Sequence, residues 1–458
     1  MIEKVQERRP IVKPVKKQEL STASIWNMNM GFLGIQFGFA LQTGNASRIL
    51  QTYGADVEHL PLFWLAAPVT GMIIQPLIGY YSDHTWTRLG RRRPFFLVGA
   101  FLAAFSLILM PQSSMFAAFL PPVLIGGAML MLMDASFNIA MEPFRALVAD
   151  NLPESQYSKG FAVQTFLISI GAIIGSLFPY LLANGFNIAK TALPGEIPDN
   201  VAYSFYFGAA IMLITLLWTV ITTKEYTPEE RAAFHPGEKK VTEKKTALSI
   251  FSDFRKMPQT MAQLGLVQFF SWFGLFAMWI YMTPAIVEHI YKLMPGDTVS
   301  EQYADAGNWV GMLFGVYSVV AAIYALGLPA IARRIGKKAT HAISLAAGGT
   351  GLLSVYFISD PKLLIMPMIG MGLAWGSVLA MPYAILSAAI PAKKMGVYMG
   401  IFNFFITLPQ LVIGFAGGPL IKSIFHNQAI YAIVLAGIFM LCGALSVVFI
   451  REKGRRAI

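Results

Sequence analysis

The sequence contains few charged residues and almost no cysteine. Only 13% of its 458 residues are Asp, Glu, Lys or Arg, whereas about 25% is usual for a soluble domain. So little charge cannot cover the surface of a water-soluble chain of this length, which excludes a cytosolic enzyme or a disordered scaffold. The single Cys442 allows neither an internal disulfide nor a thiolate metal cage. With 56% hydrophobic residues, the composition indicates a polytopic membrane protein.

The motifs of common enzymes are also absent. The chain has no phosphate-binding P-loop, no Gly-x-Ser-x-Gly and no His-Glu-x-x-His. Its six histidines fall in expected loops or at the ends of apolar runs, which gives neither a metal triad nor a histidine relay inside the membrane. We therefore expect a protein that is not an enzyme and that needs no cofactor or metal.

Long apolar runs take the place of these motifs. A helix needs about 20 mainly apolar residues to cross the hydrocarbon core of a bilayer. Twelve such runs occur, in two sets of six, and the fold class expected is an all-α membrane protein. The expected spans cover residues 22–43, 60–81, 94–110, 117–141, 161–183, 200–222, 261–288, 308–331, 339–358, 361–389, 396–421 and 428–450.

The distribution of Lys and Arg predicts the orientation of these spans. Alternate loops and both tails hold 30 of the 35 basic residues, and the opposite loops hold only five, among them Arg48 and Lys190. Basic loops stay on the cytoplasmic side, so both termini are expected there. The first apolar run is too long for a cleavable signal peptide. The net charge of +11 therefore reflects contact with a lipid bilayer and not with nucleic acid.

The two sets of spans share an internal repeat. Gly79 and the basic run 88–93 follow the second span, and Gly327 with the basic run 333–338 follows the eighth. Pro143 and Pro382 similarly follow the fourth and tenth. A duplicated six-helix unit with a basic linker is the plan of major-facilitator transporters. The boundaries expected are 1–21 for a cytoplasmic tail, 22–222 and 259–450 for the two halves, 223–258 for a cytoplasmic linker and 451–458 for a second tail.

The loop after the second span has the residues of a conformational latch. A carboxylate ends the span close to several arginines, and two glycines permit close helix approach and a tight turn. Such an ion pair can hold one conformation and break in another. An ordinary positive-inside loop explains the basic run 88–93 or the run 333–338 taken alone. It explains less well the presence of both runs at matching places in the two halves. The latch residues expected are Gly79, Asp83, Arg88, Gly90, Arg91 and Arg92.

One carboxylate, Asp134, lies well inside an expected span. A charge at that depth costs at least about 2.5–3.5 kcal/mol on insertion scales, so Asp134 is a functional candidate, although a neutral Asp could serve helix packing alone. Asn138 and Arg145 fall on the same helical stripe if Pro143 does not kink the helix. We expect Asp134 to carry a proton and Arg145 to donate to hydroxyl groups or to act in gating. Glu142 can pair with Arg145 instead.

Amide and indole side chains inside other spans suit an uncharged polyol, because amides donate and accept hydrogen bonds and indoles cover sugar C–H groups. A single Trp is more often a packing or interfacial residue. The candidates for substrate binding or gating are Gln36, Gln42, Asn138, Arg145, Gln164, Gln268, Trp272 and Asn403.

Several of these residues carry a family resemblance. The runs 36–42, 64–95 and 134–150, with Gln42, Asp83 and Arg145 among them, are similar to the sucrose/proton symporters of the glycoside–pentoside–hexuronide:cation branch of the major-facilitator superfamily. The similarity is specific from about residue 30 to 165 and weaker beyond. Glu142 departs from the glycine usual in plant members, and the short loops look more like bacterial relatives.

The resemblance implies the import of a disaccharide with protons by alternating access. Without a targeting segment, we expect the plasma or inner membrane, and we expect a monomer. The substrates implied are sucrose, maltose or a related α-glucoside. It places the protonatable carboxylate at Asp134, a cation essential for transport at Arg145 and a sugar contact at Gln42. The alternatives are a symporter for another glycoside or a monosaccharide, coupled to Na⁺ or to protons, and a sugar sensor that does not transport.

Overall fold

The described part of the chain is built from helices. The computed structural model describes residues 17–234, 257–389 and 395–451, and no strand is assigned among them. The helices before the central linker, with a short one at its start, are α1 (Thr22–Asn29), α2 (Gly31–Thr52), α3 (Leu60–Trp64), α4 (Ala66–His84), α5 (Arg93–Leu109), α6 (Pro122–Asn151), α7 (Tyr157–Gly185), α8 (Asp199–Thr222) and α9 (Pro228–Phe234). Those after it are α11 (Gln259–Ala285), α12 (Glu301–Ile335), α13 (Lys337–Ser354), α14 (Ile365–Ala389), α15 (Met395–Pro419) and α16 (Ile430–Ser446).

The predicted all-helical membrane fold is confirmed, and each of the twelve expected ranges contains a helix. In the described part of the chain, ten helices are long and apolar enough to cross a membrane. The ranges 22–43 and 339–358 fall outside these ten. The first holds several amides, and α13 begins with Lys337 and Lys338 and contains His341. The count of twelve spans therefore remains a prediction.

Several expected boundaries differ from those of the helices, most of all in α2 and α6. Helix α2 continues to Thr52, so that Arg48, expected in a loop, lies inside the helix. Helix α6 begins at Pro122 and not at residue 117, and it continues past Pro143 to Asn151. Proline is well suited to the first turn of a helix, where its missing N–H is not needed. Asp134, Asn138 and Arg145 therefore lie on one continuous helix, which contains Pro143.

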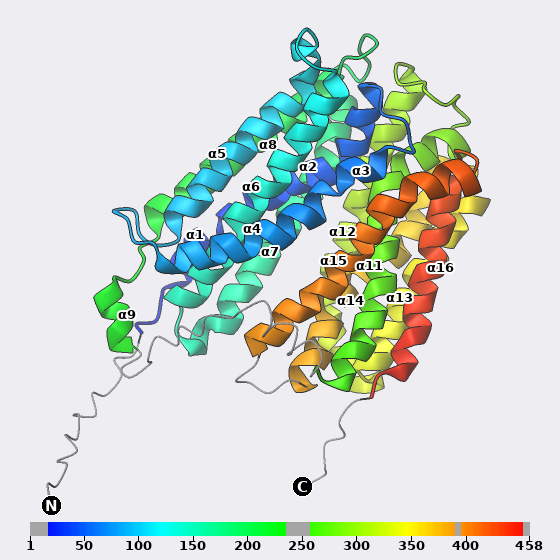
Figure 1. Ribbon diagram of the computed structural model, residues 1–458. Coiled ribbons are helices and arrows are strands. Elements are labelled where there is room, and N and C mark those ends of the chain that lie inside the picture. The colour runs from blue at the N-terminus through cyan, green and yellow to red at the C-terminus, as the bar shows by residue number, and fades with distance from the viewer. Residues whose placement is uncertain (1–16, 235–256, 390–394, 452–458) are drawn as a thin grey trace, which may run out of the picture.

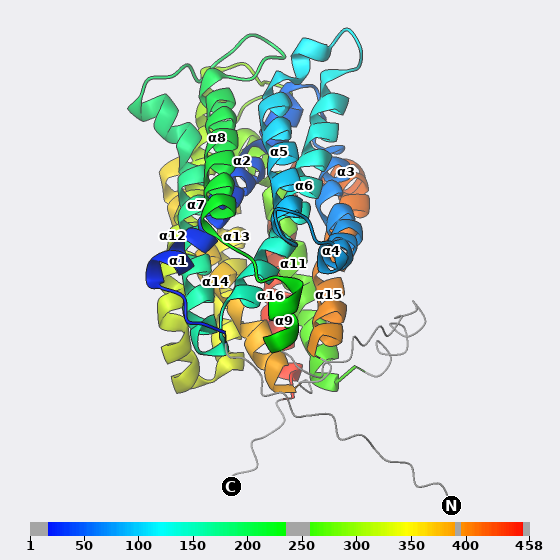
Figure 2. The same cartoon turned by 90° about the vertical axis from the view of Figure 1, so that its left-hand side faces the viewer.

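The helices form two groups that lie side by side (Figure 1). One group contains α1–α8 and the other α11–α16. We call the end that holds loop 85–92 and α9 the linker end (Figure 2), and the other the opposite end. The groups converge toward the opposite end and diverge toward the linker end (Figure 1). Helix α7 contacts α12, α2 contacts α11 and α12, and α3 contacts α15.

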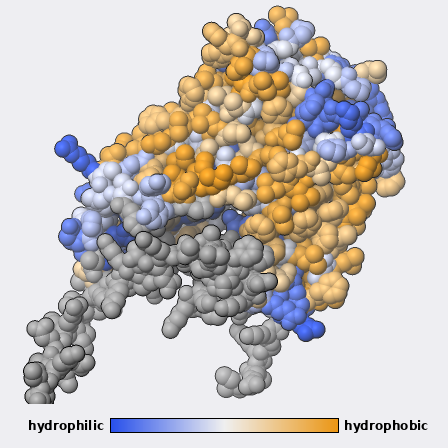
Figure 3. All heavy atoms as spheres, in the orientation of Figure 1, coloured by the Kyte–Doolittle hydropathy of each residue, from blue (hydrophilic) through white to orange (hydrophobic). Residues whose placement is uncertain are grey.

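Apolar side chains cover the flank of the molecule. In the space-filling view hydrophobic residues form a broad region between more polar ends (Figure 3). Many large apolar side chains are exposed, including Leu326 on α12 and Ile221 on α8, at 85% and 79%. A soluble monomer does not expose apolar surface of this extent, whereas the hydrocarbon core of a bilayer accommodates it. The chain is a multi-pass membrane protein.

Small residues allow the helices of the first group to approach closely. A Cβ added at Gly34 of α2 would lie 2.6 Å from the Cα of Met212 on α8. A Cβ at Gly171 of α7 would contact the carbonyl oxygen of Leu33. Both obstacles are backbone atoms, which cannot move aside without separating the helices. This packing holds α2, which carries Gln42, between α7 and α8.

We expect Gly34→Ala to lower stability by about 1–3 kcal/mol, because an overpacked contact must shift backbone. The melting temperature of the detergent-solubilised protein measures this loss. Gly327→Ala on α12 is the matched control, since no atom of the described residues lies within 4 Å of the added Cβ. Equal melting temperatures for the two variants would contradict the close approach of α2 and α8.

Candidate functional site

Asp134 is buried between α6 and α2. Its side chain is only 3% exposed, and the Nε2 amide of Gln42 donates a hydrogen bond of 2.6 Å to its Oδ1. The other amide atom of Gln42, Oε1, is buried without a hydrogen-bond partner in the described part of the chain. A buried carboxylate held by one neutral amide is poorly compensated for the water it has lost. Uptake of a proton would remove that charge.

A chain of amides extends the site toward α4. Asn138 Nδ2 donates to the backbone carbonyl of Asp134 at 2.9 Å and lies 3.4 Å from Thr70 Oγ1. Gln75 Nε2 donates to Asn138 Oδ1 at 2.7 Å. The structure therefore brings together three of the residues predicted from the sequence, Gln42, Asp134 and Asn138. It adds Gln75 and Thr70, which the search for polar residues inside spans could have included.

Arg145 lies near the linker end of α6. Its side chain is exposed and acts electrostatically on the hydroxyl group of Tyr383 in α14. The side chain of Glu142 lies outside the described residues, so its predicted pairing with Arg145 stays untested.

The remaining candidates from the sequence are not joined to Asp134 by a described hydrogen bond. Gln36 is half-buried and Asn403 is exposed. Gln164 is 8% exposed, with a partnerless Oε1. Gln268 is completely buried, and neither of its amide atoms has a hydrogen-bond partner in the described chain. Unpaired buried amides are rare in native proteins, so Gln268 stands out among them.

Three tryptophans form an aromatic cluster in the second group of helices. Trp272 and Trp279 of α11 and Trp375 of α14 lie with ring centroids 5.6–6.3 Å apart in edge-to-face contacts. Trp279 Nε1 donates to the Tyr317 hydroxyl at 3.3 Å, whereas Trp272 Nε1 has no described partner. All three rings are half-buried. Trp375 was not predicted, because a lone Trp inside a span most often serves packing.

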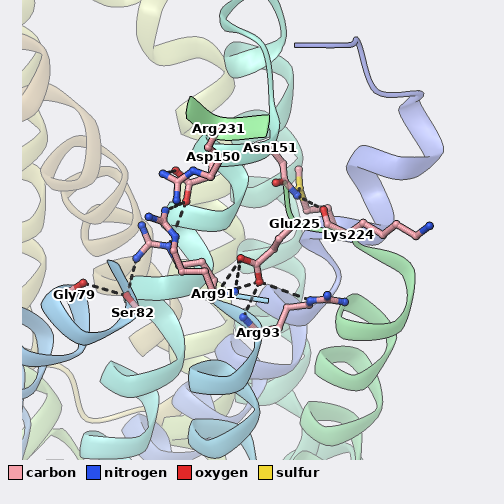
Figure 4. A network of polar contacts seen from close by, with 11 residues as sticks. Gly79, Ser82, Arg91, Arg93, Asp150, Asn151, Lys224, Glu225 and Arg231 are labelled. Atoms are coloured by element: carbon pink, nitrogen blue, oxygen red, sulfur yellow. Dashed lines mark hydrogen bonds and ion pairs between the residues drawn. The ribbon is translucent and has the colours of Figure 1, made fainter. Parts of the chain in front are cut away.

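Residues 85–92 form a loop at the linker end, which we call the arginine loop, and two carboxylates hold it in place. Asp150, at the end of α6, accepts a hydrogen bond from Arg91 and one of 3.2 Å from Arg92 Nε (Figure 4). Arg92 Nη1 also donates to Ser82 Oγ at 2.6 Å. Arg231 of α9 approaches Asp150 at 3.7 Å. Burial lowers the pKa of the Arg91 guanidinium, an effect that Asp150 opposes.

Glu225 follows α8, and its side chain caps the N-terminus of α5. Its carboxylate accepts backbone N–H bonds from Arg91, Arg92 and Arg93 at 2.9–3.0 Å. A carboxylate at this position satisfies N–H groups that the first helical turn leaves unpaired. Gly90 has φ of +111°, and a Cβ there would lie 2.6 Å from Glu225 Oε1. Gly90 is therefore required by both its backbone conformation and the space available.

The other expected latch residues contribute less to this network. Arg88 is exposed, and a Cβ at Gly79 would meet no described atom within 4 Å. The side chain of Asp83 lies outside the described residues, so its role stays a prediction. The partners that the structure adds, Asp150 and Glu225, are 58 or more residues from the arginines.

In the described residues, one group of side chains has the spacing of a metal site. Asp56, Glu58 and His59 bring their ligand atoms within 4.8 Å of one another. The group lies in the loop before α3, and Lys422 already pairs with Glu58 at 3.1 Å. It has no connection with the buried site around Asp134.

Comparison with known proteins identifies the family. The family model described as Major Facilitator Superfamily matches residues 37–414. This chain belongs to the major facilitator superfamily. The match spans both groups of helices and the linker between them. The members compared below are transporters, and the chain is not classed with enzymes.

The chain is similar over most of its length to named sugar transporters. It is 26% identical to the sucrose transport protein SUT5 of Oryza sativa subsp. indica, covering 91% of this chain and 85% of that protein. It is 25% identical to the sucrose transport protein SUC4 of Arabidopsis thaliana, covering 90% and 86%. A general alpha-glucoside permease of Schizosaccharomyces pombe is 28% identical over 67% of this chain and 57% of the permease.

Solved structures share the fold. A D-xylose–proton symporter has a TM-score of 0.67 at 14% identity, covering 96% of this chain and 100% of the symporter. The nucleoside transporter NupG has a TM-score of 0.65 at 13% identity, covering 94% and 99%. The predicted major-facilitator fold is confirmed.

We expect Glu225→Gln to loosen the first turn of α5, because a neutral amide replaces a carboxylate that accepts three backbone N–H bonds. Hydrogen exchange at residues 91–93 should speed up by roughly tenfold, as the loss of bonds to a charged acceptor implies. Glu229→Gln on the exposed face of α9 is the control. Unchanged exchange in Glu225→Gln would show that this carboxylate does not hold the loop.

Proposed function

We propose that this protein imports a disaccharide together with protons by alternating access between its two groups of helices. The substrates proposed are sucrose, maltose or a related α-glucoside. The linker end and both termini would face the cytoplasm, and the protein would act as a monomer in the plasma or inner membrane. The buried hydrogen bond between Gln42 and Asp134 is the observation that supports proton coupling most directly.

The relatives support the substrate class. Two of them are named for sucrose transport and one for alpha-glucosides, and the first two are similar over about 90% of this chain. The amides of Gln42, Asn138 and Gln75 suit a ligand with many hydroxyl groups and no charge. None of these three side chains would require an ionised substrate.

The contact between Gln42 and Asp134 suggests how proton and sugar binding are coupled. While Asp134 is ionised, its carboxylate accepts the Gln42 amide proton in a charge-assisted hydrogen bond. Protonation of Asp134 weakens that bond and leaves the Gln42 amide available to a sugar hydroxyl. Sugar binding then favours the protonated site, because each ligand raises the affinity for the other.

The second group of helices would supply the other wall of the sugar site. Gln268 and Trp272 are four residues apart on α11 and so project from one face. Both have buried polar atoms without described partners, which a sugar hydroxyl could satisfy. The edge-to-face cluster with Trp279 and Trp375 gives this wall an aromatic surface for sugar C–H groups.

We expect Asp134→Asn to abolish sugar accumulation against a gradient while sugar exchange continues, because Asn still accepts from Gln42 but carries no proton. Proteoliposomes with an imposed pH gradient measure accumulation, and preloaded vesicles measure exchange. Asp199→Asn, at the exposed start of α8, is the matched control. Full accumulation by Asp134→Asn would remove Asp134 from proton coupling.

We expect Arg145→Lys to lower the uptake rate by about tenfold or more, since a compact ammonium cannot replace the planar, multiply donating guanidinium. Initial rates of labelled sugar uptake give the comparison. Arg334→Lys, on the exposed linker end of α12, should transport normally. If Arg145→Lys also transports at the wild-type rate, Arg145 serves only as a basic residue of the cytoplasmic face.

A further inference from the structure

Arg48 is a fully buried arginine at the boundary between the two groups of helices. It lies in α2 and is 2% exposed. No carboxylate in the described chain forms an ion pair with it, and its Nη2 has no hydrogen-bond partner there. The Asp305 carboxylate acts on Arg48 only from a distance, and a buried charge without an ion pair is costly. Its presence therefore calls for a function.

The partners of Arg48 come from α12 in the second group. Nη1 donates to Asn308 Oδ1 at 2.9 Å, and the guanidinium carbon lies 5.9 Å from the centre of the Tyr303 ring. Gly307 packs directly on the side chain, since a Cβ there would lie 2.7 Å from Arg48 Cδ. The adjacent Ser47 donates to the carbonyl of Ile280 in α11 at 2.9 Å.

Asn200 completes a buried triad with Arg48 and Asn308. Its Nδ2 donates to Asn308 Oδ1 at 2.9 Å and to the carbonyl of Pro179 in α7 at 3.0 Å. One amide oxygen of α12 thus accepts bonds from α2 and from the start of α8. Asn200 is 0% exposed and Asn308 2%, so water does not compete for these bonds.

Two partly exposed ion pairs also join the first group of helices to α12. Lys190, in the loop before α8, pairs with Glu301 at 2.9 Å and with Asp305 at 2.8 Å. These hydrogen bonds raise the pKa of Lys190. Exposed ion pairs contribute little to stability, so the buried triad is the stronger candidate for a gate.

We infer that Arg48, Asn200 and Asn308 form the gate that closes the opposite end of the transporter, and that they set the balance between its two conformations. A substrate arriving from that end requires α2 to separate from α12, which breaks the bond between Arg48 and Asn308. Opening returns the guanidinium to water, and closing buries it again. Opening therefore loses the bond between Arg48 and Asn308 but regains hydration of the guanidinium. Because these two contributions have opposite signs, a small alteration in the triad shifts the conformational equilibrium. These are positioning residues, and the inference depends on alternating access and not on the identity of the sugar.

Asn308 permits two substitutions with opposite expected effects. Asn308→Ala removes the acceptor and should favour opening. Asn308→Asp keeps the shape, adds an opposite charge and replaces a partnerless Nδ2 with an oxygen that can accept from Arg48 Nη2. A carboxylate binds a guanidinium more strongly than an amide does, so this variant should favour closure.

Opening can be followed with one cysteine placed behind the gate. Ser176 of α7 is 5% exposed, and its carbonyl lies 2.9 Å from a Cβ added at Gly311 of α12, about one turn inward from Asn308. We propose Ser176→Cys in a Cys442→Ser background, which removes the one natural cysteine. A membrane-impermeant maleimide added to intact cells reports opening of this end without any sugar.

We expect Asn308→Ala to speed up labelling of the reporter by about tenfold, and Asn308→Asp to slow it by a similar factor. The slowing should disappear in an Arg48→Gln background. Asn184→Asp, at the exposed end of α7, makes the same chemical change outside the triad and should alter labelling less than twofold. Equal labelling of Asn308→Ala and Asn308→Asp, in cells and in detergent, would overturn the gate. Differences seen in detergent but not in cells would support the gate and contradict the proposed orientation.

Discussion

Burial of the Asp134 carboxylate is the constraint on which the site depends. The bilayer excludes nearly every charge from the helices, and Asp134 remains with one described side-chain hydrogen bond, from Gln42. That bond joins α6 to α2, and Asn138 and Gln75 extend it to α4. Protonation of the carboxylate would act directly on the bond to α2, whereas the link to α4 runs through the backbone carbonyl of Asp134.

The two ends of the molecule are held by different kinds of contact. At the linker end, Asp150 and Glu225 bind the arginine loop within the first group of helices. At the opposite end, Arg48 and Lys190 bind the second group. The first network stiffens one group without joining it to the other, whereas the second closes one face of the transporter. The structure therefore represents a conformation closed at the opposite end.

Much of the fold could be predicted, because hydropathy and basic loops are local properties of the sequence. Asp134 was found because charge is scarce, and its stripe with Asn138 follows from helical periodicity. Asp150 and Glu225 were not assigned to the arginine loop, since no spacing rule relates a motif to carboxylates at the ends of distant helices. Arg48 was counted only as a loop charge, because its contact with Asn308, 260 residues away, exists only once the two groups pack.

Proton movement that depends on sugar tests the central claim most directly. Purified protein in proteoliposomes, with a pH-sensitive dye inside and no imposed pH gradient, would receive an inward gradient of sucrose, maltose or another α-glucoside. We predict that the vesicle interior acidifies as a transported disaccharide enters, and that the change depends on the protein. Entry of labelled disaccharide without any change in internal pH would contradict coupling through Asp134.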